Sequence, residues 1–178
     1  MPVYSEENIA ELKSRVKILY AANQTEEALK VMVKIPEEER DYEMWFLAGN
    51  IAQDNEDSKS AIYFLQKSIR LNPAFDKAYY NLGNIYLSEK RYNAAIEEYK
   101  TAIKYKKDFA YSHYNLGCAY LGVKAYRDAK SEFEKAIKLK AEPDFYYNLA
   151  YVSKLLNKPK DQQAALDKYN ELKEETVK

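Results

Sequence analysis

The sequence predicts an all-α fold of about five antiparallel helix pairs, and the first observation behind this is an internal repeat. Residues 79–86, Tyr-Tyr-Asn-Leu-Gly-Asn-Ile-Tyr, recur in altered form 34 residues later at 113–120 and 34 residues earlier at 45–52. A looser copy occupies residues 146–153. A fixed period of this size is typical of repeat proteins, in which each unit buries its apolar face against the next.

Glycine and proline positions are the second and third observations. Three of the four glycines fall on one place of the repeat, and these are Gly49, Gly83 and Gly117. Proline inside a helix removes a hydrogen bond and clashes with the preceding turn. All five prolines lie at proposed helix ends or turns, and these are Pro2, Pro36, Pro73, Pro143 and Pro159.

We expect one domain over residues 1–178 with helix pairs at 5–36, 41–73, 76–108, 110–141 and 143–174. The first pair is interpreted as a degenerate repeat, because terminal repeats often serve as caps. Its first helix is expected to begin at a Ser5 cap and to reach about Ala22. Its second helix is expected to begin at a Thr25 cap and to end at Pro36.

The later pairs have comparable start and stop signals. Asp57 or Ser58 is expected to cap the second helix of the second pair, since short polar side chains accept hydrogen bonds from free helix N–H groups. Pro143 and Pro159 are expected to begin the two helices of the fifth pair, because proline is favoured in the first helical turn.

Small residues are expected at the crossing of the two helices in each pair. We predict that Gly83 lies opposite Ala95, and that Gly117 lies opposite Ala129. Tyr, Leu and Phe would fill the space around each crossing, so that successive pairs share one elongated core.

These residues resemble the tetratricopeptide repeat family. The matching places are Trp45, Ala48, Gly49, Ala52, Ala61, Leu65, Ser68 and Pro73 in the second copy; Tyr79, Leu82, Gly83, Tyr86, Ala95, Tyr99 and Ala102 in the third; and His113, Leu116, Gly117, Tyr120, Ala129, Phe133 and Ala136 in the fourth. The closing proline of the family is kept only in the second copy. The resemblance implies a right-handed α-solenoid, and a non-catalytic scaffold that binds a protein or peptide partner.

Composition excludes several classes of function. Lys plus Arg and Asp plus Glu each number 28, so the formal net charge is zero, whereas nucleic-acid binding relies on a surplus of basic residues. No apolar run is long enough for a membrane span. We expect no cofactor and no metal. The start of the sequence shows no signal peptide, which favours a cytoplasmic protein, although a trimmed exported protein would look the same.

Two residues with reactive side chains are better explained as packing residues. His113 is the single histidine and stands where the family has a large aromatic residue. Cys118 is the single cysteine and has no ligand spacing to any partner, although a reactive thiol on the concave face is the alternative. Adjacent glutamates point about 100 degrees apart on a helix and do not form acid–base pairs. We therefore predict no catalytic residue.

The resemblance places a row of aromatic and amide residues on the concave surface formed by the first helices. Tyr offers rigid contact area with a polar tip, and Asn can donate and accept hydrogen bonds with a peptide backbone. The alternative is that the same side chains only pack between adjacent repeats. The predicted peptide groove consists of Phe46, Asn50, Tyr80, Asn81, Asn84, Tyr114, Asn115, Cys118, Tyr147, Asn148 and Tyr151.

One specialised ligand class is disfavoured. Family members that hold chaperone tails ending in Glu-Glu-Val-Asp use basic residues at three places that here hold Phe46, Tyr111 and Asn115. Two further alternatives for the chain are a self-assembling structural module, in which end helices stack between copies, and a fragment of a larger enzyme or secretion complex.

Overall fold

The computed structural model describes residues 8–176, which form two compact units divided after Ala78. The first unit contains α1 (Ile9–Ala21), α2 (Thr25–Met32), the short 3-10 helix η1 (Glu37–Glu39), α3 (Tyr42–Asp54) and α4 (Ser58–Leu71). The division falls inside α5 (Asp76–Ser88). The second unit continues with α6 (Tyr92–Tyr105), α7 (Ala110–Gly122), α8 (Tyr126–Leu139), α9 (Pro143–Leu155) and α10 (Pro159–Thr176).

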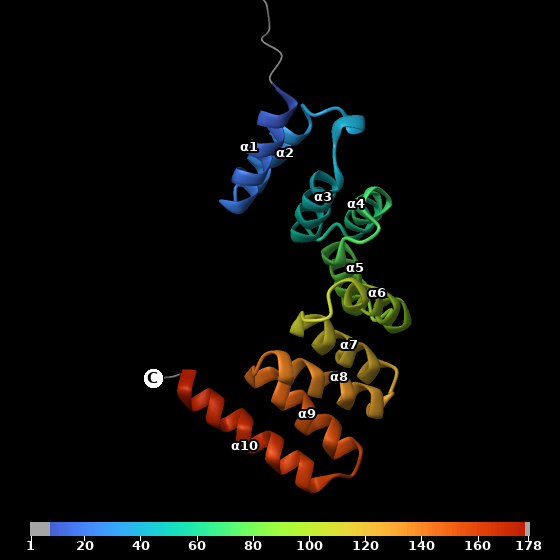
Figure 1. Ribbon diagram of the computed structural model, residues 1–178, viewed down its shortest axis with the longest axis vertical. Helices are drawn as coiled ribbons and strands as arrows, with labels where there is room; N and C mark the ends of the chain where they lie inside the picture. Colours follow the sequence, from blue (N-terminus) through green and yellow to red (C-terminus); the bar gives the residue numbers. More distant parts are fainter. Residues whose placement is uncertain (1–7, 177–178) are drawn as a thin grey trace, which may run out of the picture. The chain divides into compact units, whose positions relative to one another are not determined.

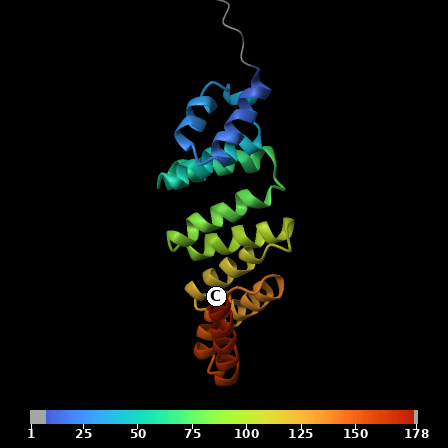
Figure 2. The ribbon, with the colours of Figure 1, turned by 90° about the vertical axis from the view of Figure 1, so that its left-hand side faces the viewer.

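The helices lie in antiparallel pairs, as the sequence predicts. Within the first unit α1 packs on α2 and α3 on α4 (Figures 1 and 2), and within the second unit α7 packs on α8 and α9 on α10. The first helices of the pairs begin at residues 9, 42, 76, 110 and 143, in steps of 33, 34, 34 and 33 residues. The second helices begin in the same steps, so the period includes the first pair, although that pair lacks the repeat glycine.

Several helix ends follow the predicted signals. Asp57 is the N-cap of α4 and accepts a 3.1 Å hydrogen bond from the Ser60 N–H, and Pro143 is in the first turn of α9. The predicted Ser5 cap lies outside the described residues, and among those described α1 follows an Asn8 cap. Thr25 is not a cap as predicted but the first residue of α2.

The turn inside every pair contains one residue in the left-handed region. The N–H group of the residue after it closes the preceding helix: the Arg91 N–H donates to the Tyr86 carbonyl at 2.8 Å, and the Ala125 N–H donates to the Tyr120 carbonyl at 2.9 Å. This is the Schellman arrangement of helix C-termini. The left-handed residues, with φ from 59° to 61°, are Asn23, Glu56, Lys90, Lys124 and Asn157.

The core of the first unit joins its two pairs. Leu12 and Val16 of α1 cluster with Met32 of α2 and with Met44 and Ile51 of α3. At about 25 cal/mol per Å² of buried apolar surface, such a cluster is the main source of stability for the unit. Ion pairs at the rim, Lys13 with Asp41 and Lys17 with Glu43, also link α1 to the start of α3.

The repeat glycines of the second unit make room for an aromatic ring. A Cβ placed on Gly83 would lie 2.6 Å from the Tyr99 ring, and a Cβ placed on Gly117 would lie 2.6 Å from the Phe133 ring. We predicted that these glycines lie opposite Ala95 and Ala129; the atoms nearest to each glycine belong to the aromatic residue one turn further along the second helix. Helical side chains lean toward the N-terminus of their helix, so the aromatic residue reaches back over the turn before it.

Candidate functional site

Hydrogen bonds join three of the predicted groove residues, Tyr80, Asn84 and Asn115, to one another and to Tyr99. Asn115 of α7 donates through Nδ2 to the Tyr80 hydroxyl at 3.2 Å and to Asn84 Oδ1 at 2.8 Å. The Tyr99 hydroxyl donates to the same Asn84 oxygen at 2.7 Å. The Tyr80 ring meets the edge of Phe109 at 5.1 Å, and burial raises the pKa of Tyr80. These groups hold α5, α6 and α7 together.

The same bond recurs one repeat later. Asn148 of α9 donates through Nδ2 to the Tyr114 hydroxyl at 2.7 Å and lies 3.9 Å from the Cys118 sulfur. The Tyr114 ring stacks on Phe145, with centroids 4.4 Å apart. Burial raises the pKa of the Cys118 thiol to about 11, so the reactive thiolate is scarce at neutral pH. We call the bonds from Asn115 to Tyr80 and from Asn148 to Tyr114 the tyrosine–asparagine ladder.

Tyr147 and Tyr151 are in a different environment, although they occupy the corresponding places on α9. Their exposed fractions are 54% and 50%, and Leu155, one further turn along, is 39% exposed. The Tyr147 ring packs beside Tyr169 of α10 at 5.6 Å. Neither tyrosine hydroxyl has a hydrogen-bond partner within residues 8–176. These three residues form an open amphipathic surface, which we call the α9 face.

The first unit contributes Phe46 and Asn50 to the predicted groove. Phe46 lines a cavity of about 210 Å³ together with Leu47 and Phe75. The Phe46 and Phe75 rings meet edge to face at 5.0 Å. Asn50 is half-buried one turn further along α3, and Asn81 is half-buried on α5.

His113 has a structural role that its neighbours define. Its Nδ1 lies 2.7 Å from Glu132 Oε2 on α8, and its Nε2 lies 3.1 Å from the Lys107 carbonyl in the turn before α7. Burial favours the neutral acid, but hydrogen bonds from His113 and Lys135 outweigh it and lower the pKa of Glu132. The ring therefore ties α7 to α8 and to the preceding turn. No group of side chains suited to a metal occurs among the described residues.

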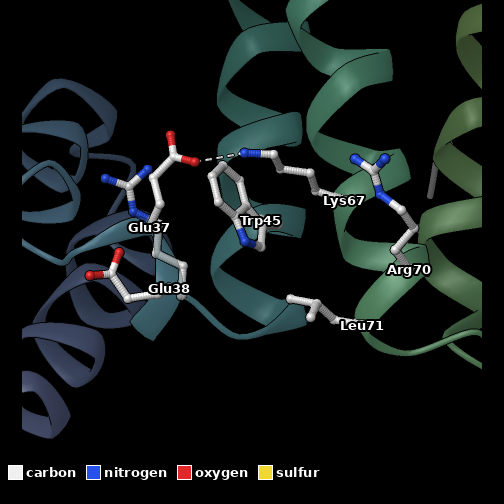
Figure 3. A pocket seen from close by; sticks show the side chains of 7 residues that line it. Glu37, Glu38, Trp45, Lys67, Arg70 and Leu71 are labelled. Atoms are coloured by element: carbon white, nitrogen blue, oxygen red, sulfur yellow. Dashed lines mark hydrogen bonds and ion pairs between the residues drawn. The ribbon is translucent and has the colours of Figure 1, made fainter.

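A second cavity of the first unit, of about 390 Å³, lies beside Trp45. Figure 3 shows that the Lys67 ammonium reaches across the indole toward Glu37, with Nζ 2.8 Å from Oε2 and 3.9 Å from the ring centroid. The hydrogen bond from Lys67 lowers the pKa of Glu37. Because Lys67 and Glu37 already neutralise each other, we interpret the residues around this cavity as the contact between η1 and α4 and not as a ligand site.

Two loop phenylalanines were missed in the sequence interpretation. Phe75 and Phe109 precede α5 and α7, and each packs against the groove residue of its unit, Phe46 or Tyr80. The signal was present, since both stand 34 residues apart in the same place of the repeat. Lys77, which borders the Phe46 cavity, carries no such signal.

Family models match the repeated helix pairs of this chain. Models described as tetratricopeptide repeat match residues 42–75 and 110–143 and, in a shifted register, residues 64–97. A further model described as TPR repeat matches residues 83–123. The chain is a tetratricopeptide repeat protein. The matches together extend over residues 42–143, where the aromatic, Leu-Gly and Ala pattern is clearest.

Solved structures of other tetratricopeptide repeat proteins share the fold. MamA from Desulfovibrio magneticus RS-1 superimposes with a TM-score of 0.85 at 21% identity, over 95% of this chain and 97% of that one. AMB-1 MamA superimposes with a TM-score of 0.82 at 16% identity, over 93% and 92%. At such identities the likeness establishes the fold alone, and it confirms the predicted all-α right-handed solenoid. No curated protein matches the chain in sequence.

The helices of residues 8–176 can also be compared with membrane-spanning segments. None of them combines the length and the apolar composition that a bilayer crossing requires.

Proposed function

We propose that this tetratricopeptide repeat protein is a non-catalytic scaffold that binds a peptide segment of a partner protein, with the α9 face as its principal contact surface in the second unit. The fold is typical of interaction scaffolds. The observation that carries the proposal is the pair of exposed tyrosines, Tyr147 and Tyr151, whose hydroxyls have no partner within residues 8–176.

The rest of the molecule provides an internal comparison. Tyr80 and Tyr114 hold the same repeat place, and each receives a hydrogen bond from an asparagine of the next helix pair. Tyr147 presents the same ring and hydroxyl without that asparagine. A partner backbone or side chain can supply the missing hydrogen bond while its apolar atoms cover the rings, and Tyr is enriched among the residues that dominate binding energy.

The remaining groove residues of the second unit support this surface. Asn81, Asn84 and Cys118 are half-buried, and so are the four residues of the tyrosine–asparagine ladder. We propose that they fix the first helices and offer only their exposed edges to the peptide. Because the α9 face consists of tyrosine and leucine side chains, binding at this face should depend weakly on salt.

The test compares two double variants of the full chain. Tyr147→Ser with Tyr151→Ser removes the α9 face. Tyr63→Ser with Tyr105→Ser is the matched control, because those tyrosines are 50% and 41% exposed on second helices. Affinity capture from an extract of the native host, quantified by mass spectrometry, should retain a partner on the parent and on the control. Loss of two anchors, each worth about 2 kcal/mol, should abolish capture by the first variant.

Equal capture by both double variants would refute the α9 face as the binding surface. The circular dichroism spectrum of each variant should match the parent, since the four tyrosines are surface residues and surface changes usually alter stability by less than about 0.5 kcal/mol.

Self-association is a second candidate, and the same observation favours it. A helix pair of another copy that stacks on α9 and α10 would place a polar side chain against Tyr147, as Asn148 is placed against Tyr114. Light scattering of the purified chain distinguishes the two. A monomer supports peptide binding, whereas an oligomer that Tyr147→Ser with Tyr151→Ser dissociates supports self-association.

A further inference from the structure

The cavity at Phe46 has an apolar floor and a charged rim. Its apolar lining residues, which we call the floor, are Phe46 and Leu47 of α3 and Phe75 of the loop before α5. Its charged lining residues, which we call the rim, are Lys17, Glu43 and Lys77. All six residues belong to the first unit, so this cavity is separate from the α9 face.

The size of the cavity limits its occupant. Its volume is about 210 Å³, below the range of roughly 300–1,000 Å³ of pockets that enclose drug-sized ligands and cofactors. A single leucine, methionine or phenylalanine side chain suits this space better than a small-molecule cofactor. A lining of two aromatic rings and a leucine favours an apolar group over a polar one.

The three charged side chains at the rim differ in whether they already have an ion-pair partner. Lys17 is hydrogen-bonded to Glu43, and this bond raises the pKa of Lys17. Lys77 has no ion-pair partner among residues 8–176. The available charge at the rim is therefore the positive charge of Lys77, which complements a carboxylate on the occupant.

We propose that this cavity binds an apolar side chain of a partner peptide that carries an Asp or Glu beside it, with the apolar group against Phe46 and the carboxylate at Lys77. The inference rests on the proposed peptide-binding function and names the chemistry of the partner segment. It adds a second contact site, in the first unit, with its own specificity.

The third helix pair does not repeat this combination of an apolar floor and an available cation. At the place of Phe46 it has Tyr80, whose hydroxyl accepts a hydrogen bond from Asn115. At the place of Lys77 it has Tyr111, whose hydroxyl is 3.0 Å from Lys140 Nζ and 3.3 Å from Glu142 Oε1. The apolar floor and the available cation are thus both replaced by internally satisfied polar groups.

The experiment selects random twelve-residue peptides displayed on phage against the immobilised full chain. Enriched peptides should share an apolar residue next to Asp or Glu. Lys77→Glu should remove the preference for acids and select Lys or Arg in their place. Lys59→Glu is the matched control, because Lys59 is exposed on α4 of the same unit and does not line the cavity.

A fluorescein-labelled copy of the most enriched peptide then measures affinity by anisotropy. Phe46→Ala and Lys77→Glu should each weaken binding about tenfold or more, and Lys59→Glu should change it less than about twofold. Lys77→Glu alters only a surface side chain, so it tests the inference even if Phe46→Ala impairs folding.

Two other outcomes are decisive. Peptides that bind Lys77→Glu as tightly as the parent, but not Tyr147→Ser with Tyr151→Ser, would overturn this inference and leave the proposed function standing. If selection enriches no peptide at all, the proposed function fails and this inference fails with it.

Discussion

Replacing single tyrosines by phenylalanine tests which groove residues are structural. Tyr114→Phe removes the hydroxyl that accepts the 2.7 Å bond from Asn148, whose amide is then left with the Cys118 sulfur at 3.9 Å. An unsatisfied buried donor costs about 1–3 kcal/mol. Because Asn148 is half-buried and water can reach it, we expect about 1 kcal/mol.

The other two tyrosines complete a graded series. Tyr80→Phe removes a longer bond, at 3.2 Å, and Asn115 keeps its 2.8 Å bond to Asn84, so the expected loss is about 0.5 kcal/mol. Tyr147→Phe removes a hydroxyl with no partner within residues 8–176, so the stability should change by less than about 0.5 kcal/mol.

Urea denaturation followed by circular dichroism measures the series. With a slope of about 1–3 kcal/mol per molar urea, Tyr114→Phe should lower the midpoint by about 0.3–1 M. A neutral Tyr114→Phe, or a Tyr147→Phe as costly as Tyr114→Phe, would refute the distinction between the tyrosine–asparagine ladder and the α9 face.

Three further predictions concern packing, pH and thiol chemistry. Gly117→Ala should lower the stability by up to about 2 kcal/mol, because overpacking against the buried Phe133 ring outweighs a gain in helix propensity of about 1 kcal/mol. Adding Phe133→Leu to Gly117→Ala should restore part of the loss. A Gly117→Ala chain with a higher urea midpoint than the parent would contradict this. Because the pKa of Glu132 is lowered in the folded chain, its carboxylate contributes stability above the unfolded pKa of about 4.3, and this contribution is lost as the pH falls through the folded pKa. Glu132→Gln should therefore be less stable than the parent at pH 7 and equally stable in acid. A difference in stability that stays constant in thermal melts from pH 7 to pH 3 would refute this. Iodoacetamide at pH 8 should alkylate Cys118 on the order of 100-fold more slowly in the native than in the unfolded chain, and equal rates would show an exposed thiolate.

The repeat made the helix pairs predictable from the sequence. The spacing of Gly49, Gly83 and Gly117 sets the register of three first helices, and Pro143 and Pro159 mark the starts of two others. These signals are local or periodic, so they can be recognised in the sequence without knowing how the helix pairs pack.

The roles of the asparagines were not predictable in the same way. Asn115 and Asn148 look identical to ligand-binding amides in the sequence, and only the distance to the tyrosine of the preceding pair shows that they bind internally. That distance depends on how adjacent pairs stack. The contrast between Tyr114 and Tyr147 has the same origin, because it depends on what packs beside each helix.

The turns inside the pairs were hidden for a different reason. Lys90 and Lys124 have φ near +60°, a conformation that favours glycine or asparagine. Their side chains give no turn signal, so the Schellman hydrogen bonds that close the helices were visible only in the structure.

The central claim is that the α9 face contacts the partner, and site-specific photocrosslinking tests it most directly. Benzoylphenylalanine would be introduced at Tyr151 and, as a control, at the equally exposed Tyr63 of α4, in the native host. The account predicts a crosslinked partner protein from position 151 and none from position 63. Crosslinks from position 63 alone would contradict it, and a crosslink from position 151 to a second copy of the chain would replace partner binding by self-association.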